Sequence, residues 1–178
     1  KSIEKTTENT LRVVQMLGSD VPVYRGCAEP LAKLLERERV PEAVPNIRLE
    51  VDGQVVQMHA DYLDLPPAAI QAQDIPAPVF YLKYLRQADE PVTLVAVGPL
   101  TNLAVAFMLD SEIVTKVKRI IVMGGGYQVT NATSTAEFNI WYDPEAAQRV
   151  LNSGAAVVFV PFDATHKACI SKADCADL

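Results

Sequence analysis

Clustered basic residues are missing from this 178-residue chain, which carries 16 Lys and Arg against 22 Asp and Glu. The net charge is therefore -6 at pH 7, and the basic residues are scattered along the sequence. Because binding to a phosphate backbone requires grouped Lys and Arg side chains, this distribution argues against a general nucleic-acid surface. The composition favours an uncharged or cationic small ligand, and no nucleic-acid partner is expected.

Long apolar runs are also absent, and no stretch approaches the length needed to cross a bilayer. The first residue, Lys1, opens no signal-peptide pattern. Cysteine is scarce: Cys27, Cys169 and Cys175 are odd in number and lack the spacing of zinc ligands, so reduced thiols are expected. We therefore expect a soluble, cytoplasmic protein with no membrane partner.

The composition that remains is that of a globular protein, with 49% hydrophobic and 21% charged residues. The length suits one ordinary domain with a sizeable core. The sequence opens in a predicted helix and stops inside another that begins near Ser171, a pattern expected of a domain cut at both ends. We predict a single α/β domain over residues 1–178.

The first half of the sequence is rich in proline and poor in regular patterns. Apolar residues at helical spacing predict a helix over 2–17. An extended piece at 21–24 contains a proline and is predicted to be an edge or terminal strand. Residues 26–76 are predicted to be mostly loop, with a short helix at 31–39, and a further helix is predicted at 78–87.

The second half predicts a parallel sheet. Short apolar runs indicate buried strands at 93–97 and 119–123, and a further strand is predicted at 155–160. One helix follows the turn that ends at Asn102, and another begins near Asp143, so two strand-helix-strand units share the middle strand. This order is typical of a Rossmann-like α/β sheet with helices outside.

Three glycines, 124–126, follow the middle strand directly, at the sheet edge where ligands of open α/β sheets bind. If the chain beyond them is extended, Glu137 and Asn139 point to one side and Phe138 to the other. A carboxylate and an amide on one side suit adjacent sugar hydroxyls. The sequence therefore predicts a sugar-facing pair beside this turn.

Two acidic residues near the turn are interpreted differently. Asp143, followed by Pro144 and Glu145, is predicted to be a helix N-cap. The sequence predicts no capping role for Glu137, so a ligand contact and a solvated loop carboxylate both stay open.

Ordered motifs surround this turn and extend through most of the chain. They are residues 22–26, 98–102, 122–126, 131–134, 136–140, 143–147 and 163–166. Together they resemble the inosine-uridine-preferring nucleoside hydrolases, over nearly the whole chain and most densely at 93–166. The resemblance implies a parallel-sheet nucleoside hydrolase fold.

The same resemblance implies an enzyme that hydrolyses the N-glycosidic bond of ribonucleosides to free base and ribose, with a bound calcium ion. It implies three side chains against the ribose hydroxyls: Asn131, Glu137 and Asn139. It also implies that Met123 contacts the sugar, that Phe138 lies near the base, and that the carbonyl of Val97 is a calcium ligand. For Met123, Phe138 and Val97, plain core packing is the alternative. We expect a homo-oligomer, of a subunit number that the sequence leaves open.

Some family features are missing. The aspartate-rich metal motif, Asp-x-Asp-x-Gly-x-Asp-Asp, does not occur here, and no residue fills the role of general base. His59 falls where the family has a substrate-covering loop and is a candidate base contact, although Ala60 and Leu63 replace glycines of that loop. His166 is expected to be structural.

The sequence leaves one alternative function open and disfavours another. A catalytically silent nucleoside-binding or assembly module would keep the ribose contacts without the metal motif. A dinucleotide-binding domain is disfavoured, because residues 124–126 lack the spaced Gly-x-Gly-x-x-Gly pattern. The sequence does not rank purine against pyrimidine substrates.

Overall fold

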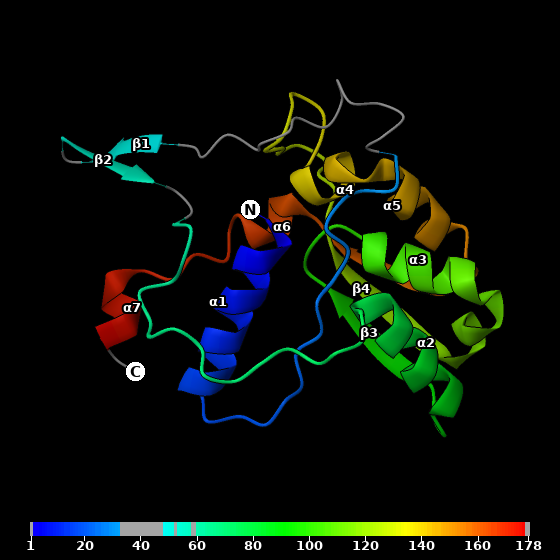
Figure 1. Cartoon of the computed structure of the whole chain (residues 1–178). Coiled ribbons are helices and arrows are strands. Elements are labelled where there is room, and N and C mark those ends of the chain that lie inside the picture. The colour runs from blue at the N-terminus through cyan, green and yellow to red at the C-terminus, as the bar shows by residue number, and fades with distance from the viewer. Residues whose placement is uncertain (1, 33–47, 52, 58–59, 177–178) are drawn as a thin grey trace. The chain divides into compact units, whose positions relative to one another are not determined.

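The computed structural model describes residues 2–32, 48–51, 53–57 and 60–176 (Figure 1). The chain divides into two compact units. The first unit comprises residues 1–29 and 33–80, and the second comprises residues 30–32 and 81–178. Each unit is held together in a different way.

The first unit contains α1 (Ile3–Met16) and an antiparallel hairpin of β1 (Arg48–Val51) and β2 (Gln54–Gln57). Helix α1 confirms the helix predicted at 2–17. The extended piece at 21–24 forms only an isolated bridge between Tyr24 and Gln73, so the predicted strand is wrong. The hairpin was not predicted, and most of the helix predicted at 31–39 lies outside the described residues.

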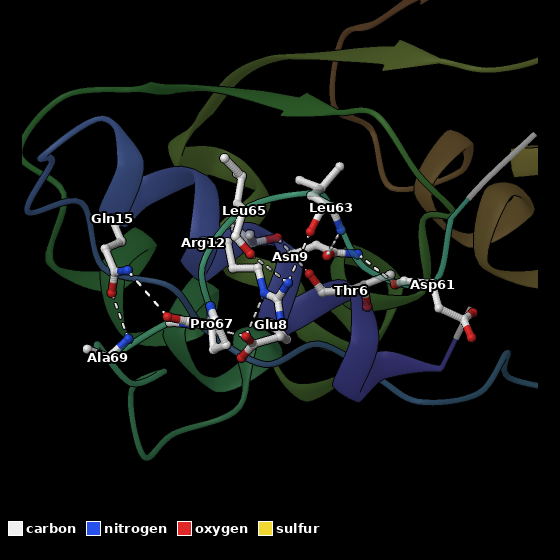
Figure 2. A network of polar contacts seen from close by, with 12 residues as sticks. Thr6, Glu8, Asn9, Arg12, Gln15, Asp61, Leu63, Leu65, Pro67 and Ala69 are labelled. Atoms are coloured by element: carbon white, nitrogen blue, oxygen red, sulfur yellow. Dashed lines mark hydrogen bonds and ion pairs between the residues drawn. The ribbon is translucent and has the colours of Figure 1, made fainter.

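Polar side chains of α1 bind the segment 61–69 of the same unit (Figure 2). Arg12 donates to the carbonyls of Leu63 and Leu65, each at 3.0 Å, and pairs with Glu8 at 2.8 Å. On the neighbouring turns, Asn9 bonds to the backbone of residues 61 and 63, and Gln15 to that of residues 67 and 69. These bonds give a segment without regular structure a defined path along the helix.

The second unit contains a three-stranded parallel sheet in the order β3-β4-β5. Its strands are β3 (Val92–Ala96), β4 (Val117–Met123) and β5 (Val157–Val160). Its helices are α2 (Ala77–Gln87, from Tyr81 onward in this unit), α3 (Thr101–Leu109), the 3-10 helix η1 (Ser111–Lys116), α4 (Phe138–Tyr142), α5 (Pro144–Leu151), α6 (Phe162–Thr165) and α7 (Lys172–Ala176). Both predicted strand-helix-strand units are confirmed.

One apolar cluster joins α2, α3 and α5 to one face of the sheet. Phe107 of α3, Leu85 of α2 and Val150 of α5 are at most 1% exposed, and they pack with Ile120 and Val122 of β4. Burial of large apolar side chains contributes about 1.5–3 kcal/mol each, so this cluster is the main stabilising element of the unit.

The predicted strand at 93–97 is not buried as a whole. In β3 only Leu94 is buried, whereas Val95 is 65% exposed. The reason is strand alternation: Leu94 faces the apolar cluster, and Val95 lies on the other face of the sheet. In the part of the chain that the structure describes, none of the helices has the length and apolar character of a membrane span.

Candidate functional site

The chain turns sharply where β4 ends. Gly124 N–H donates to the Val160 carbonyl at 3.3 Å, and Gly125 then takes a φ of +72°, which favours glycine. At Gly126, a Cβ would lie 2.2 Å from the Val129 carbonyl oxygen, so no side chain fits there. The three glycines thus allow a tight turn in which the chain folds back on itself.

Glu137 is bound to this turn. Its carboxylate accepts from Gly125 N–H at 3.0 Å, and from Asn139 N–H at 2.9 Å and Ile140 N–H at 3.2 Å. The residue is the N-cap of α4 and only 2% exposed. A capping role is therefore present, and the alternative of a solvated loop carboxylate is wrong. The sequence did not predict the short helix α4, and this helix explains both why Glu137 has a capping role and why its carboxylate is not solvated.

Asn139 reaches the other side of the turn. Its amide nitrogen donates to the Met123 carbonyl at 3.0 Å and lies 3.2 Å from the Met123 sulfur. Glu137 and Asn139 do not alternate along an extended strand, because Asn139 lies in the first turn of α4. Their side chains instead bind the same turn: Asn139 donates to the carbonyl of residue 123, and Glu137 accepts from Gly125 N–H.

Asn131 and Phe138 complete this group. The side-chain oxygen of Asn131 accepts from Phe138 N–H at 2.8 Å, and Asn131 itself is exposed. The Phe138 ring lies 6.1 Å from the ring of Trp141 and 5.6 Å from that of Tyr142. The structure thus brings together five of the residues that the sequence predicted: Met123, Asn131, Glu137, Phe138 and Asn139.

Val97 lies at the same edge of the sheet. It directly follows β3, whose last residue, Ala96, pairs with Val122 of β4, so Val97 lies at the level of Met123. Val97 is 76% exposed, which rules out core packing for its side chain. The remaining candidate, His59, lies outside the described residues.

Asp143 does more than the sequence predicted. Its carboxylate accepts from Ala146 N–H at 3.1 Å, which confirms the predicted N-cap of α5. It also accepts from the Thr101 hydroxyl at 2.5 Å and from Leu31 N–H at 3.1 Å, and it is fully buried. Asp143, at the end of α4, is therefore bonded to the start of α3. Helix α3 begins four residues after Val97.

The described residues offer few of the donors that the predicted calcium ion would need. Calcium takes about six to eight oxygen ligands, mostly carboxylates, carbonyls and waters. The described part of the chain holds no group of three or more His, Cys, Asp or Glu side chains suited to a metal. The carbonyl of Val97, an exposed residue, would supply one ligand, but the described residues do not form a calcium cradle by themselves.

Comparison with known proteins identifies the family. A sequence profile for the inosine-uridine preferring nucleoside hydrolases matches residues 1–178. The chain belongs to this family. Among curated relatives, the pyrimidine-specific ribonucleoside hydrolases RihA of Shewanella sp. (strain ANA-3) and Enterobacter sp. (strain 638) are 37% and 38% identical over 172 residues. Those alignments cover 96% of this chain and 50% and 51% of the relatives, so the chain spans about half their length.

Solved nucleoside hydrolase structures confirm the predicted fold class. The plant nucleoside hydrolase PpNRh1 superposes with a TM-score of 0.75 at 31% identity, over 93% of this chain and 49% of that one. An inosine-guanosine nucleoside hydrolase superposes with a TM-score of 0.70 at 24% identity, over 90% of this chain and 48% of that one. The parallel α/β sheet is thus a nucleoside hydrolase sheet.

Proposed function

We propose that the protein hydrolyses the N-glycosidic bond of ribonucleosides. Membership of the nucleoside hydrolase family over residues 1–178 carries this proposal. The gathering of Met123, Asn131, Glu137, Phe138 and Asn139 at one glycine turn supports it, because these are the residues that the resemblance assigns to ribose and base. Since the RihA relatives are named pyrimidine-specific, uridine is the first substrate to test and inosine the second.

In the proposed reaction, water adds to C1′ of the ribose while the C1′–N bond breaks. The bonding electron pair leaves with the base, which takes up a proton. The transition state has oxocarbenium character, so a buried negative charge beside the ribose stabilises it. Glu137 suits this task, because three backbone N–H groups fix its carboxylate in place before substrate binds. A rigid carboxylate needs little reorganisation during the reaction.

Asn131 and Asn139 are proposed to bind the ribose hydroxyls. Asn139 uses its amide nitrogen on the Met123 carbonyl, which leaves its carbonyl oxygen to accept from a hydroxyl. Asn131 uses its carbonyl oxygen on Phe138 N–H, which leaves its amide nitrogen to donate. The two amides thereby offer one acceptor and one donor to a diol.

Calcium dependence, a cytoplasmic location, a homo-oligomeric state and a single domain are further proposals. The family resemblance supports calcium, with the Val97 carbonyl as one ligand. When bound, calcium would lower the pKa of a coordinated water. The scarcity of cysteine supports the cytoplasm. The homo-oligomeric state rests on the family resemblance, and the single domain rests on the length of the chain.

The decisive experiment measures base release from uridine and inosine by the full-length protein. Glu137→Gln and Asn139→Ala are each expected to lower kcat/KM by about 10²-fold or more, as for other groups that stabilise a developing charge. Glu112→Gln, which changes an exposed acid in η1, and Asn152→Ala, which changes an exposed amide after α5, are matched controls. Removal of calcium by a chelator should abolish turnover, and added calcium should restore it.

Full turnover in both site variants would contradict the proposed roles. Binding of uridine without any base release, in the presence of calcium, would instead favour the catalytically silent module. Circular dichroism of each variant separates a loss of chemistry from a loss of the α4 cap, which is worth about 1 kcal/mol.

A further inference from the structure

A single carboxylate binds the loop between the glycine turn and Asn131. Asp163 accepts from Tyr127 N–H at 2.7 Å, from Gln128 N–H at 2.8 Å and from Val129 N–H at 3.2 Å. Asp163 lies in α6, which follows β5, more than thirty residues further along the chain. The helix that follows the neighbouring strand β5 therefore supplies the group that organises this loop.

The same segment also holds the turn itself. Phe162 N–H, directly before Asp163, donates to the Gly125 carbonyl at 2.9 Å. The N–H of Gly125 donates to Glu137 at 3.0 Å. Gly125 is thus fixed from two sides, by the residue that caps α4 and by the start of α6.

Apolar burial does not hold this loop in place. Tyr127 is 89% exposed and Gln128 is exposed. The three backbone N–H donors lower the pKa of the Asp163 carboxyl below its ordinary value, so the group is ionised at neutral pH. Hydrogen bonds to an ionised acceptor are about twice as strong as neutral ones. Asp163 therefore accounts for the order of residues 127–129.

We propose that Asp163 is a positioning residue for the ribose site. By fixing residues 127–129, it sets the place of Asn131 and so the hydrogen bond from Phe138 N–H to the Asn131 side chain. This inference rests on the proposed function for its ligand, but its geometry stands independently. The competing explanation is local: Asp163 lies in the first turn of α6, where an acidic side chain interacts favourably with the helix dipole.

Amide hydrogen exchange in the full-length protein distinguishes the two explanations. Asp163→Asn keeps the shape but offers one acceptor oxygen and places an amide N–H₂ against a backbone donor. Exchange at residues 127–129 is expected to rise about tenfold or more. Phe138 is the remote reporter, because its N–H contacts Asn131 and not Asp163, and it should rise with them.

The matched control is Asp174→Asn. Asp174 is exposed, whereas Asp163 is half-buried, and like Asp163 it accepts a backbone hydrogen bond, from Ser171 N–H at 2.7 Å at the start of α7. It should leave the four reporter amides unchanged. Faster exchange at 127–129 with an unchanged Phe138 amide would overturn the proposal, because Asp163 would then act only locally. Unchanged exchange at all four amides would overturn it as well.

Asp163→Glu covers the case in which Asp163→Asn does not fold. Asp163→Glu keeps the charge but moves the carboxylate by one methylene, so a smaller rise in exchange at the same amides is expected. The absence of any rise in this variant would overturn the proposal.

Titration with uridine separates this inference from the proposed function. Affinity should fall about tenfold in Asp163→Asn. A wild-type protein that does not bind uridine would refute the proposed function, while the amide result would still decide the role of Asp163.

Discussion

The two units of the chain are stabilised by different kinds of contact. In the second unit, a cluster of buried apolar side chains joins three helices to a parallel sheet. In the described part of the first unit, the only buried apolar side chains are those of Leu11, Ala77 and Pro78. There, polar side chains of α1 bind the backbone of the segment 61–69 (Figure 2).

The difference explains why the sequence predicted one unit better than the other. An apolar cluster leaves a periodic pattern along each strand and helix that contributes to it. Bonds from side chains to the backbone leave no such pattern, because the backbone is the same at every residue. The comparison also predicts that core substitutions and polar substitutions will have effects of very different size.

The largest effect is expected in the core of the second unit. Phe107→Ala should lower the free energy of unfolding by about 3–5 kcal/mol, because it leaves a cavity where a 1% exposed ring now packs. Denaturant unfolding followed by Trp141, the one tryptophan of the chain, measures it. The control is its neighbour Met108→Ala, which is 60% exposed and should cost no more than about 0.5 kcal/mol. Equal costs would contradict the assignment of the core.

A smaller and local effect is expected for Arg12→Ala in the first unit. It removes two bonds to the carbonyls of Leu63 and Leu65, the pair with Glu8, and a contact in which the guanidinium lies 4.9 Å from the Tyr62 ring. Amide exchange at Leu63 should rise about tenfold.

Lys5→Ala is the control for that experiment. Its pair with Asp61 is more exposed, and exposed pairs contribute little. The comparison between the units would fail if Arg12→Ala shifted the Trp141 transition as much as Phe107→Ala does.

The smallest effect is a pH dependence of one amide. The Arg12 side chain first, and the Ala68 N–H second, lower the pKa of Glu8 below its ordinary 4.5. A lowered carboxyl pKa contributes stability above the unfolded pKa that is lost as the pH falls through the folded pKa. The Ala68 amide should therefore lose protection below about pH 4.5.

The neighbouring Ala69 amide is an internal control, because it donates to Gln15, which does not titrate. Exchange corrected for its intrinsic pH dependence should separate the two amides in one experiment. If both amides lost protection together, the segment would open as a whole and Glu8 would not be the cause.

Much of the second unit could be predicted from local patterns. Both strand-helix-strand units, the glycine turn and the Asp143 cap follow from spacing within a few residues. The short helices α4 and α6 were missed, because elements of five and four residues are too short to show a period. In the first unit, the hairpin of β1 and β2 was missed because its strands have four residues each.

The candidate site shows where prediction from sequence ends. The residue types at 137 and 139 indicated a sugar-facing pair, and the family resemblance added Asn131 to it. The predicted geometry of this pair was wrong, because Glu137 and Asn139 converge through a turn and a short helix and do not alternate along a strand. Predicting that convergence would have required knowing that α4 starts at Phe138.

The sequence by itself determined the strand-helix-strand order of the parallel sheet, the position of the glycine turn and the family, because helix and strand periods, caps and glycines act over a few residues. Only the tertiary structure decided the partners of the acidic side chains. Glu137 reaches back 12 residues to Gly125, and Asp163 reaches back 36 residues to Tyr127. Such bonds depend on which strands become neighbours, and packing of the whole unit settles that.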